Sequence, residues 1–182
     1  MNIVAFLGSS AADSLTRQGL QAVLDDARCH GIVVDVVDLR DEHHTLQDMA
    51  HWQQPPAGSQ TARLRERVAQ ADAIVLATPV YHGSFSGLLK NALDQLTGDA
   101  FAQRPVAVLA AAGGPRSGSG VCDQLRSVVR AMGGWSTPTQ VGLSSADIVD
   151  GRPTDALRRR AAAMVAELRD FAMSRSPLQR AA

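Results

Sequence analysis

The first segment whose residues could bind a ligand is Gly8–Thr16, which follows an apolar run at the start of the chain. Gly8 allows a sharp turn, and Ser9 and Ser14 bring hydroxyl groups to the start of a predicted helix. The first amides of a helix have no intrahelical partner and carry partial positive charge, so this segment suits a phosphate group. A second interpretation stays open, in which Asp13 or Ser14 only caps the helix.

The second segment, Thr78–Asp94, carries the only tyrosine of the chain, Tyr81, with His82 beside it. Pro79 stiffens the exit from the preceding strand, and Gly83 lets a ligand approach the backbone closely. An aromatic ring in such a loop offers a stacking surface and an apolar wall. The segment therefore suits a flat ligand.

The third segment, Gly113–Ser119, has the sequence GGPRSGS and imitates a phosphate-binding P-loop. Ser119 stands where a P-loop has its lysine, so nothing reaches the β- and γ-phosphates and an NTPase is rejected. The pattern GxGxxG does not follow the first strand, which argues against an ordinary dinucleotide site. A phosphate bound by this chain would then belong to a mononucleotide.

The elements that must position these segments are short apolar runs, which predict strands, separated by stretches of helical period. The predicted strands cover residues 3–7, 32–37, 73–77 and 106–110, with a weaker run at 135–143 whose proline suits a sheet margin. The predicted helices cover residues 15–28, 88–96, 121–132 and 156–171. This order predicts an α/β fold, a doubly wound five-stranded parallel sheet with helices on both faces. Ligands bind such a sheet beyond the carboxyl ends of its strands, which is where the three segments begin.

Length and composition limit the class of protein. The chain of 182 residues predicts one domain over residues 1–173, with a flexible tail at 174–182. Its 18 basic and 18 acidic residues balance, which argues against a general nucleic-acid binder. The apolar runs are far shorter than the roughly 20 residues of a membrane span, and the first residues lack the basic region of a signal peptide. A cytoplasmic location is expected, with neither membrane nor nucleic acid as a partner.

Other residues that could do chemistry are given structural interpretations. The long aperiodic stretch 41–60 is of a kind that is usually functional or oligomeric. Its histidines, His43, His44 and His51, have no carboxylate or second cluster at ligand spacing, so a solvated loop is favoured over a metal site. Cysteines 29 and 122 fall on predicted helices, show no CxxC spacing and are interpreted as packing residues.

The second segment also contains a long spaced pattern, Pro-x-Tyr-x-x-Ser-x-x-Gly-x-Leu-Lys-x-x-Leu-Asp. The residues that form it are Pro79, Tyr81, Ser84, Gly87, Leu89, Lys90, Leu93 and Asp94. In this pattern the chain resembles the flavodoxin-like NAD(P)H-dependent FMN reductases, and it is most similar to those that supply alkanesulfonate monooxygenases. The first segment aligns with the family's Gly-Ser-x-Arg-x-x-Ser loop, except that Ala11 stands where the family has arginine. Arg17 or Arg116 could compensate for that change.

The resemblance implies FMN as the cofactor and NADPH or NADH as the reductant. By resemblance, the first loop binds the FMN phosphate, the second lies along the isoalloxazine ring and ribityl chain, and the third holds the pyrimidine edge. The cofactor-binding residues so implied are Ser9, Ser14, Leu15 and Thr16 in the first loop, Pro79, Val80, Tyr81, His82, Gly83 and Ser84 in the second, and Ala112, Gly113 and Gly114 in the third.

The implied reaction is hydride transfer from nicotinamide C4 to flavin N5, for which the cofactor supplies the chemistry. No catalytic side chain is therefore expected, and His82 is interpreted as lining the flavin or a subunit contact. The leading hypothesis is an enzyme, a homodimer or homotetramer, that reduces FMN and releases it to a partner monooxygenase. One alternative is a quinone, azo-dye or metal-ion reductase that retains FMN. Another is a flavodoxin-type electron-transfer module, which the zero net charge and lone loop tyrosine disfavour.

Overall fold

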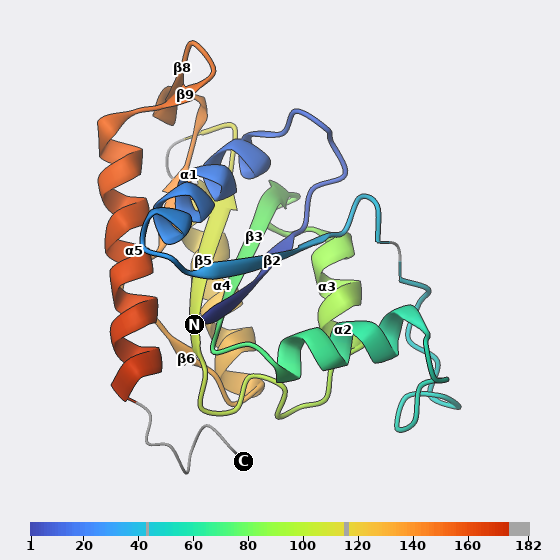
Figure 1. Ribbon diagram of the computed structural model, residues 1–182. Helices are drawn as coiled ribbons and strands as arrows, with labels where there is room; N and C mark the ends of the chain where they lie inside the picture. The colour runs from blue at the N-terminus through green and yellow to red at the C-terminus, as the bar shows by residue number, and fades with distance from the viewer. Residues whose placement is uncertain (43, 115–116, 175–182) are drawn as a thin grey trace.

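The computed structural model describes residues 1–42, 44–114 and 117–174. Its main sheet has the strand order β2-β1-β3-β5-β6, and these neighbours are all parallel. The strands are β1 (Asn2–Leu7), β2 (Val33–Asp38), β3 (Ala73–Tyr81), β5 (Pro105–Ala111) and β6 (Trp135–Ser136). Two further short strands join this sheet, β4 (Ser84–Phe85) beside β3 and β7 (Val141–Leu143) beside β5. Strands β8 (Ile148–Val149) and β9 (Arg152–Pro153) form a separate two-stranded sheet. The predicted doubly wound α/β fold is confirmed (Figure 1).

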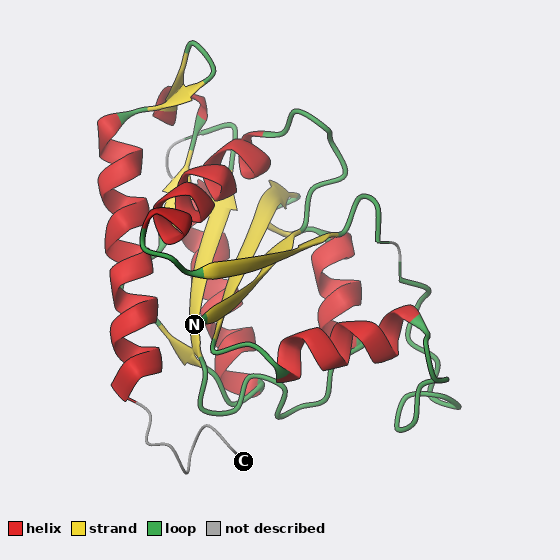
Figure 2. Ribbon diagram, in the orientation of Figure 1, coloured by secondary structure: helices red, strands yellow, loops and turns green. Residues whose placement is uncertain are grey.

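Helices cover both faces of the sheet, because its central strands are apolar on both sides (Figure 2). On one face, α1 (Leu15–Cys29) and α5 (Asp155–Ser174) pack over one cluster of buried side chains. On the other face, α2 (Gln60–Ala69), α3 (Gly87–Asp94) and α4 (Ser117–Ala131) pack over a second cluster. Strand β1 supplies both clusters by alternation, with Ile3 and Leu7 in the first and Phe6 in the second.

The fifth position of the sheet is a broken strand. The predicted run 135–143 forms β6 and β7, which pair with the two ends of β5 and leave Pro138 between them. Proline has no N–H to donate, so its place at this sheet margin is the predicted one. Ser174, the first residue of the predicted tail, is the last residue of α5. Residues 175–182 lie outside the described chain, so the tail stays a prediction.

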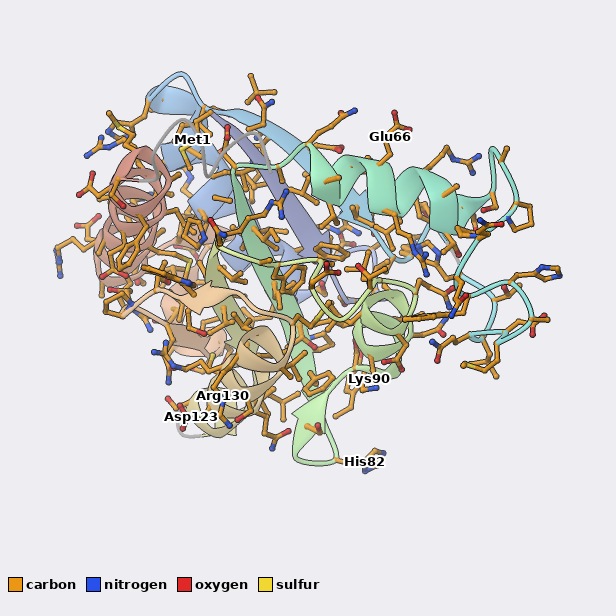
Figure 3. All side chains as sticks on the ribbon, turned by 90° about the horizontal axis from the view of Figure 1, so that it is seen from below. Met1, Glu66, His82, Lys90, Asp123 and Arg130 are labelled. Atoms are coloured by element: carbon orange, nitrogen blue, oxygen red, sulfur yellow. The ribbon has the colours of Figure 1, made fainter. Side chains whose placement is uncertain are left out.

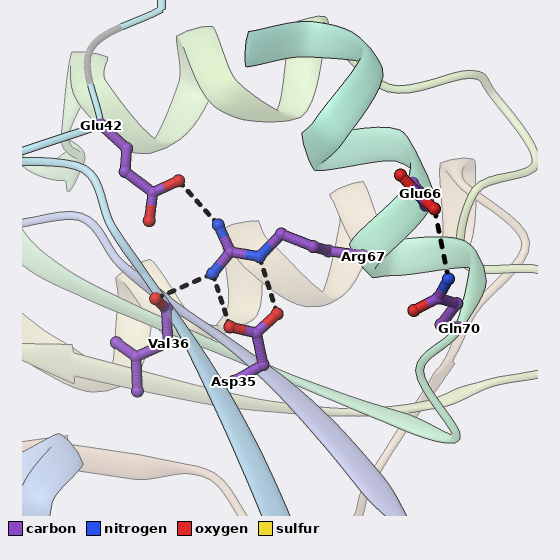
Figure 4. Close-up of polar contacts among 6 residues, drawn as sticks. All are labelled: Asp35, Val36, Glu42, Glu66, Arg67 and Gln70. Carbon is purple, nitrogen blue, oxygen red and sulfur yellow. Dashed lines mark hydrogen bonds and ion pairs between the residues drawn. The ribbon is translucent and has the colours of Figure 1, made fainter. Parts of the chain in front are cut away.

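Helix α2 was not among the predicted helices, and it protects the outer edge of β2. Arg67 donates to both carboxylate oxygens of Asp35 at 2.7 Å, to the carbonyl of Val36 at 2.9 Å and to Glu42 at 2.6 Å (Figure 4). These bonds occupy an edge that could otherwise pair with another strand. The carboxylates raise the pKa of Arg67, chiefly through the hydrogen bond to Asp35 and against the effect of burial.

Candidate flavin site

The three predicted segments begin at one edge of the sheet. Gly8 follows β1 and donates its N–H to the carbonyl of Ala77 at 2.8 Å, which fixes the first segment against β3. Pro79 on β3 pairs with Ala111 on β5, and Ala112 then donates to Leu143 at 2.9 Å. The carboxyl ends of β1, β3 and β5 therefore bring the three segments together, as predicted for a ligand site in this fold.

In the first segment, Ser14 is the N-cap of α1. Its hydroxyl accepts the N–H of Arg17 at 3.1 Å, so Ser14 rather than Asp13 caps the helix, and a phosphate contact of Ser14 stays a prediction. A serine hydroxyl keeps its proton while accepting, so this cap leaves the O–H group able to donate to an anion. Ser9 is buried and accepts the N–H of Ala11 at 3.4 Å, which closes the turn before the helix.

The start of α1 has the unsatisfied donors that a phosphate needs. Thr16 is 1% exposed, and its Oγ1 has no hydrogen-bond partner in the described chain. Leu15 is half-buried and packs against the cluster under α1, which leaves its backbone amide at the helix start as the group able to bind. An orphaned hydroxyl beside free helix amides fits a phosphate group.

Charge at this loop is low. The segment Gly8–Thr16 contains no basic residue, and Ala11 is exposed at the position of the family arginine. Arg17 lies in the first turn of α1, but its Nη1 is 2.7 Å from Oδ2 of Asp38 at the end of β2. The positive charge of Arg17 is thus already paired. Arg116, the other residue considered as a substitute, lies outside the described residues.

The second segment forms a hairpin rather than the predicted loop. Strand β3 continues through Pro79 to Tyr81, and β4 returns beside it with Tyr81 opposite Ser84. Proline is tolerated because β1 has ended at Leu7, so its missing N–H removes no bond of the ladder. His82 and Gly83, at φ values of 51° and 78°, make the two-residue turn that such hairpins favour.

A buried pair of hydroxyl groups fixes the base of this hairpin. Thr78 accepts the N–H of Ser86 at 2.9 Å, and its hydroxyl donates to the carbonyl of Pro79 at 2.9 Å. Ser86 donates to the carbonyl of Gly8 at 2.6 Å and, as the N-cap of α3, accepts the N–H of Leu89 at 3.1 Å. Ser86 thus joins the first segment to the second. The sequence alone assigns no such role to Thr78 or Ser86, because nothing in their spacing indicates a contact between distant loops.

The outer half of the hairpin is exposed. Tyr81 is 47% exposed, and His82 is at the tip of the hairpin, which projects beyond the body of the chain (Figure 3). Val80 packs against the cluster beneath α3 and α4, whereas Ser84 donates its hydroxyl to Gln124 of α4 at 2.7 Å. The predicted residues Pro79 to Ser84 therefore form one continuous arm, with its buried end at Pro79 and its exposed end at His82.

The third segment follows a buried residue, Ala112, and is then accessible to solvent at Gly113. Ala112 is buried, Gly114 is half-buried and Gly113 is exposed, and a Cβ added to Gly113 would meet nothing within 4 Å. Helix α4 then packs tightly on the sheet, since a Cβ at Gly118 would lie 2.7 Å from the carbonyl oxygen of Ala110. The backbone at Gly113 thus has open space beside it, as a bound ring edge requires.

The remaining candidate side chains do not add chemistry to this site. Burial raises the pKa of the Cys122 thiol to about 12, so this thiol stays protonated at neutral pH, and Cys29 is exposed at the end of α1. In the described ranges, no group of three or more metal-ligating side chains is placed to hold a metal ion. The solvated-loop interpretation is wrong for His44, which is half-buried, and His43 lies outside the described residues.

Comparisons with known proteins show the family to which the chain belongs. A family model described as NADPH-dependent FMN reductase matches residues 1–147. An FMN-dependent NADPH-azoreductase from Staphylococcus aureus is 32% identical over 151 residues, covering 81% of this chain and 79% of the relative. An oxidoreductase structure from Corynebacterium diphtheriae aligns with a TM-score of 0.79 at 25% identity, covering 96% of this chain and 98% of that chain. The apo structure of an NADH:FMN oxidoreductase aligns with a TM-score of 0.76 at 22% identity, covering 98% and 93%.

The strand order, with helices on both faces of a parallel sheet, places the protein in the flavodoxin-like class of α/β oxidoreductases. Within that class, the chain belongs to the NADPH-dependent FMN reductase family, because the family model matches most of its length. It is therefore an FMN-dependent enzyme that uses a nicotinamide nucleotide as reductant. The predictions of fold and cofactor are confirmed, whereas the role of each binding residue stays a prediction. No helix among the described residues is long and apolar enough to cross a membrane.

Proposed function

We propose that this reductase binds FMN as an exchangeable substrate, reduces it with NAD(P)H and supplies it to a partner monooxygenase. The observation that supports this proposal is the low charge of the first loop. Ala11 replaces the family arginine, and the charge of Arg17 is paired with Asp38 at 2.7 Å. A phosphate held by helix amides and hydroxyls, without a free cation in that loop, should dissociate more readily.

In this proposal, each of the three segments binds a different part of FMN. Ser9, Ser14 and Thr16, with the amide of Leu15, would bind the phosphate at the start of α1. The hairpin from Pro79 to Ser84, including Val80, Tyr81, His82 and Gly83, would lie along the ring and ribityl chain. Ala112, Gly113 and Gly114 would hold the pyrimidine edge, where backbone N–H groups can face N1 and the carbonyl oxygens.

The chemistry that FMN supplies when bound is acceptance of a hydride at N5 from nicotinamide C4. The chain's own part is to bind, orient and partly enclose the two nucleotides. Backbone dipoles at Gly113 and Gly114 would place partial positive charge where negative charge develops on reduction. No side chain is assigned a proton-transfer role, because this chemistry requires none from the protein.

A second candidate function is an azo-dye, quinone or metal-ion reductase that retains its FMN. The similarity to an FMN-dependent NADPH-azoreductase, 32% identical over 81% of this chain, favours it. In that case the flavin would remain bound through both half-reactions, and the second substrate would accept electrons beside the exposed hairpin. A flavodoxin-type carrier has less support, because the 18 basic and 18 acidic residues balance.

One experiment separates the two functions. The purified protein is passed through a desalting column, its flavin content is measured, and NADPH and NADH oxidation are then compared with FMN, FAD, riboflavin, a quinone and an azo dye. A colourless protein whose activity saturates with added FMN supports the exchange function. A yellow protein that keeps equimolar FMN and reduces the quinone or dye without added flavin would replace it with the second. Light scattering on the same sample tests the proposed homodimer or homotetramer.

A further inference from the structure

We infer that Gln124 on α4 is a positioning residue that holds hairpin β3–β4 in place against the third segment. Ser84 donates its hydroxyl to Oε1 of Gln124 at 2.7 Å, and Nε2 of Gln124 donates to the carbonyl of Gly83 at 2.9 Å. The amide therefore uses its acceptor and one of its donors on two neighbouring residues of the hairpin. This role rests on the proposed flavin site, because the hairpin is its ring-binding wall.

The hairpin needs such a contact because it is short. Strands β3 and β4 pair over only two positions, and a two-stranded ribbon is at best marginally stable by itself. The inner pair, Val80 with Phe85, packs against the cluster beneath α3 and α4. The outer pair, Tyr81 with Ser84, lies toward the exposed tip. Within the described chain, Gln124 supplies the side-chain hydrogen bond that reaches this outer pair.

The bond to Ser84 acts on Tyr81 through the strand pairing. Residues directly opposite each other in an antiparallel pair lie on one face, and Ser84 is opposite Tyr81. A restraint on Ser84 therefore also restrains Tyr81. The second bond, to Gly83, holds the turn that carries His82. Gln124 thus restrains both sides of the exposed arm with one side chain.

Helix α4 connects this restraint to the third segment. The helix begins at Ser117, shortly after Gly113 and Gly114, and its first turn is packed against β5 and β7 through Gly118. Gln124 lies on the same helix, two turns after its start. The side chain therefore joins the hairpin to the helix that follows Gly113 and Gly114 in the chain.

The test uses Tyr81 as a probe, because it is the only tyrosine in the chain. Protein labelled with fluorotyrosine gives one fluorine NMR signal, which reports the order of the hairpin without any cofactor. Gln124→Met keeps the length of the side chain and removes both hydrogen bonds. In the flavin-free protein we expect the signal to broaden and move toward that of free fluorotyrosine. FMN affinity should fall between about three- and tenfold, as expected for two exposed neutral hydrogen bonds.

The matched control is Gln140→Met. Gln140 donates to Asp123, the neighbour of Gln124 on α4, and makes no bond to the hairpin. This variant should leave both the fluorine signal and FMN affinity unchanged. The inference is overturned if Gln124→Met gives the wild-type fluorine signal, or if the signal changes while FMN affinity does not. Failure of the proposed function is distinct, since it would appear as a wild-type protein that keeps its FMN and does not exchange it, while the fluorine comparison on flavin-free protein still holds.

Discussion

Two segments expected to contact the flavin, the loop Gly8–Thr16 and hairpin β3–β4, are held by the fold in different ways. In the loop, Gly8, Ser9 and Thr16 are buried, and the backbone is bonded to β3 and to Ser86. In the hairpin, the turn and Tyr81 are exposed, and two hydrogen bonds to one side chain hold the outer half. Packing therefore fixes the end expected to bind the phosphate, whereas exposed hydrogen bonds hold the end expected to bind the ring.

The largest effect is expected from adding one methyl group to each segment. A Cβ on Gly8 would lie 2.9 Å from Cβ of Leu89, 3.0 Å from Oγ of Ser86 and 3.1 Å from the carbonyl oxygen of Ala77. Gly8→Ala should therefore lower the free energy of unfolding by about 3 kcal/mol. Gly83 has φ of +78° but open space around it, so Gly83→Ala should cost about 1 kcal/mol. Urea unfolding of both flavin-free variants measures the difference, and equal losses would contradict the contrast between packed loop and open hairpin.

The next effect concerns binding at the packed loop. Ser14→Asp keeps a good N-cap but places a negative charge where the phosphate should bind. Its FMN affinity should fall at least tenfold. Ser14→Ala removes one charge-assisted hydrogen bond and should weaken the binding free energy of FMN by about 1–3 kcal/mol. Fluorescence titrations with FMN and riboflavin provide the measurement. Riboflavin has no phosphate, so its affinity should barely change, and equal losses for the two flavins would place the phosphate elsewhere.

The sequence predicted those parts of the fold that depend on local pattern. Apolar runs located the strands of the sheet, and Pro138 indicated that the run 135–143 lies at its margin, because these signals lie within a few residues. The break of that run into β6 and β7 was not predicted. Helix α2 and the hairpin β8–β9 were missed. The buried residues of α2 within its ten positions are Leu64 and Val68, so its periodic signal is weak beside its arginines.

Contacts between distant segments could not be predicted in this way. Strand β3 can continue past Pro79 because β1 has already ended beside it. The residues of β3 alone carry no information about the end of β1. The bond from Ser86 to Gly8 joins residues 78 positions apart, and that from Ser84 to Gln124 spans 40. No spacing rule connects such residues. The supporting contacts of the site therefore emerged only from the folded chain.

A smaller effect is expected at the tip of the hairpin. His82 is exposed at φ of 51° and has no assigned role in proton transfer. His82→Ala should therefore slow flavin reduction less than about tenfold, whereas loss of a general acid costs about 10²- to 10⁴-fold. Single-turnover reduction at saturating NADPH, followed from about pH 5.5 to 8.5, gives the rate and its pH profile. If the rate of flavin reduction falls several hundredfold and an ionisation disappears from its pH profile, His82 is catalytic and the hairpin does more than bind the ring.

The smallest effect is expected at His44, which lies outside both segments. Its effect on stability decides whether the pH profile of the His82 variant reflects the reaction or unfolding. Burial lowers the pKa of His44 from 6.5, with Glu42 opposing the shift and Arg63 and Arg67 adding to it. Its two ring nitrogens are buried and have no hydrogen-bond partner in the described chain. The unfolded chain then binds a proton more readily than the folded one, so stability is complete above pH 6.5 and declines as pH falls through the lowered folded pKa.

His44→Phe should remove this part of the acid destabilisation. The measurement is the urea midpoint of the flavin-free protein at a series of pH values on both sides of 6.5. The exposed His51 in the same loop provides the control, and His51→Phe should keep the wild-type pH dependence. If His44→Phe also keeps it, the acid loss has another source. If the decline disappears, activity measured at low pH in the His82 comparison must be corrected for the unfolded fraction before any ionisation is assigned to the hairpin.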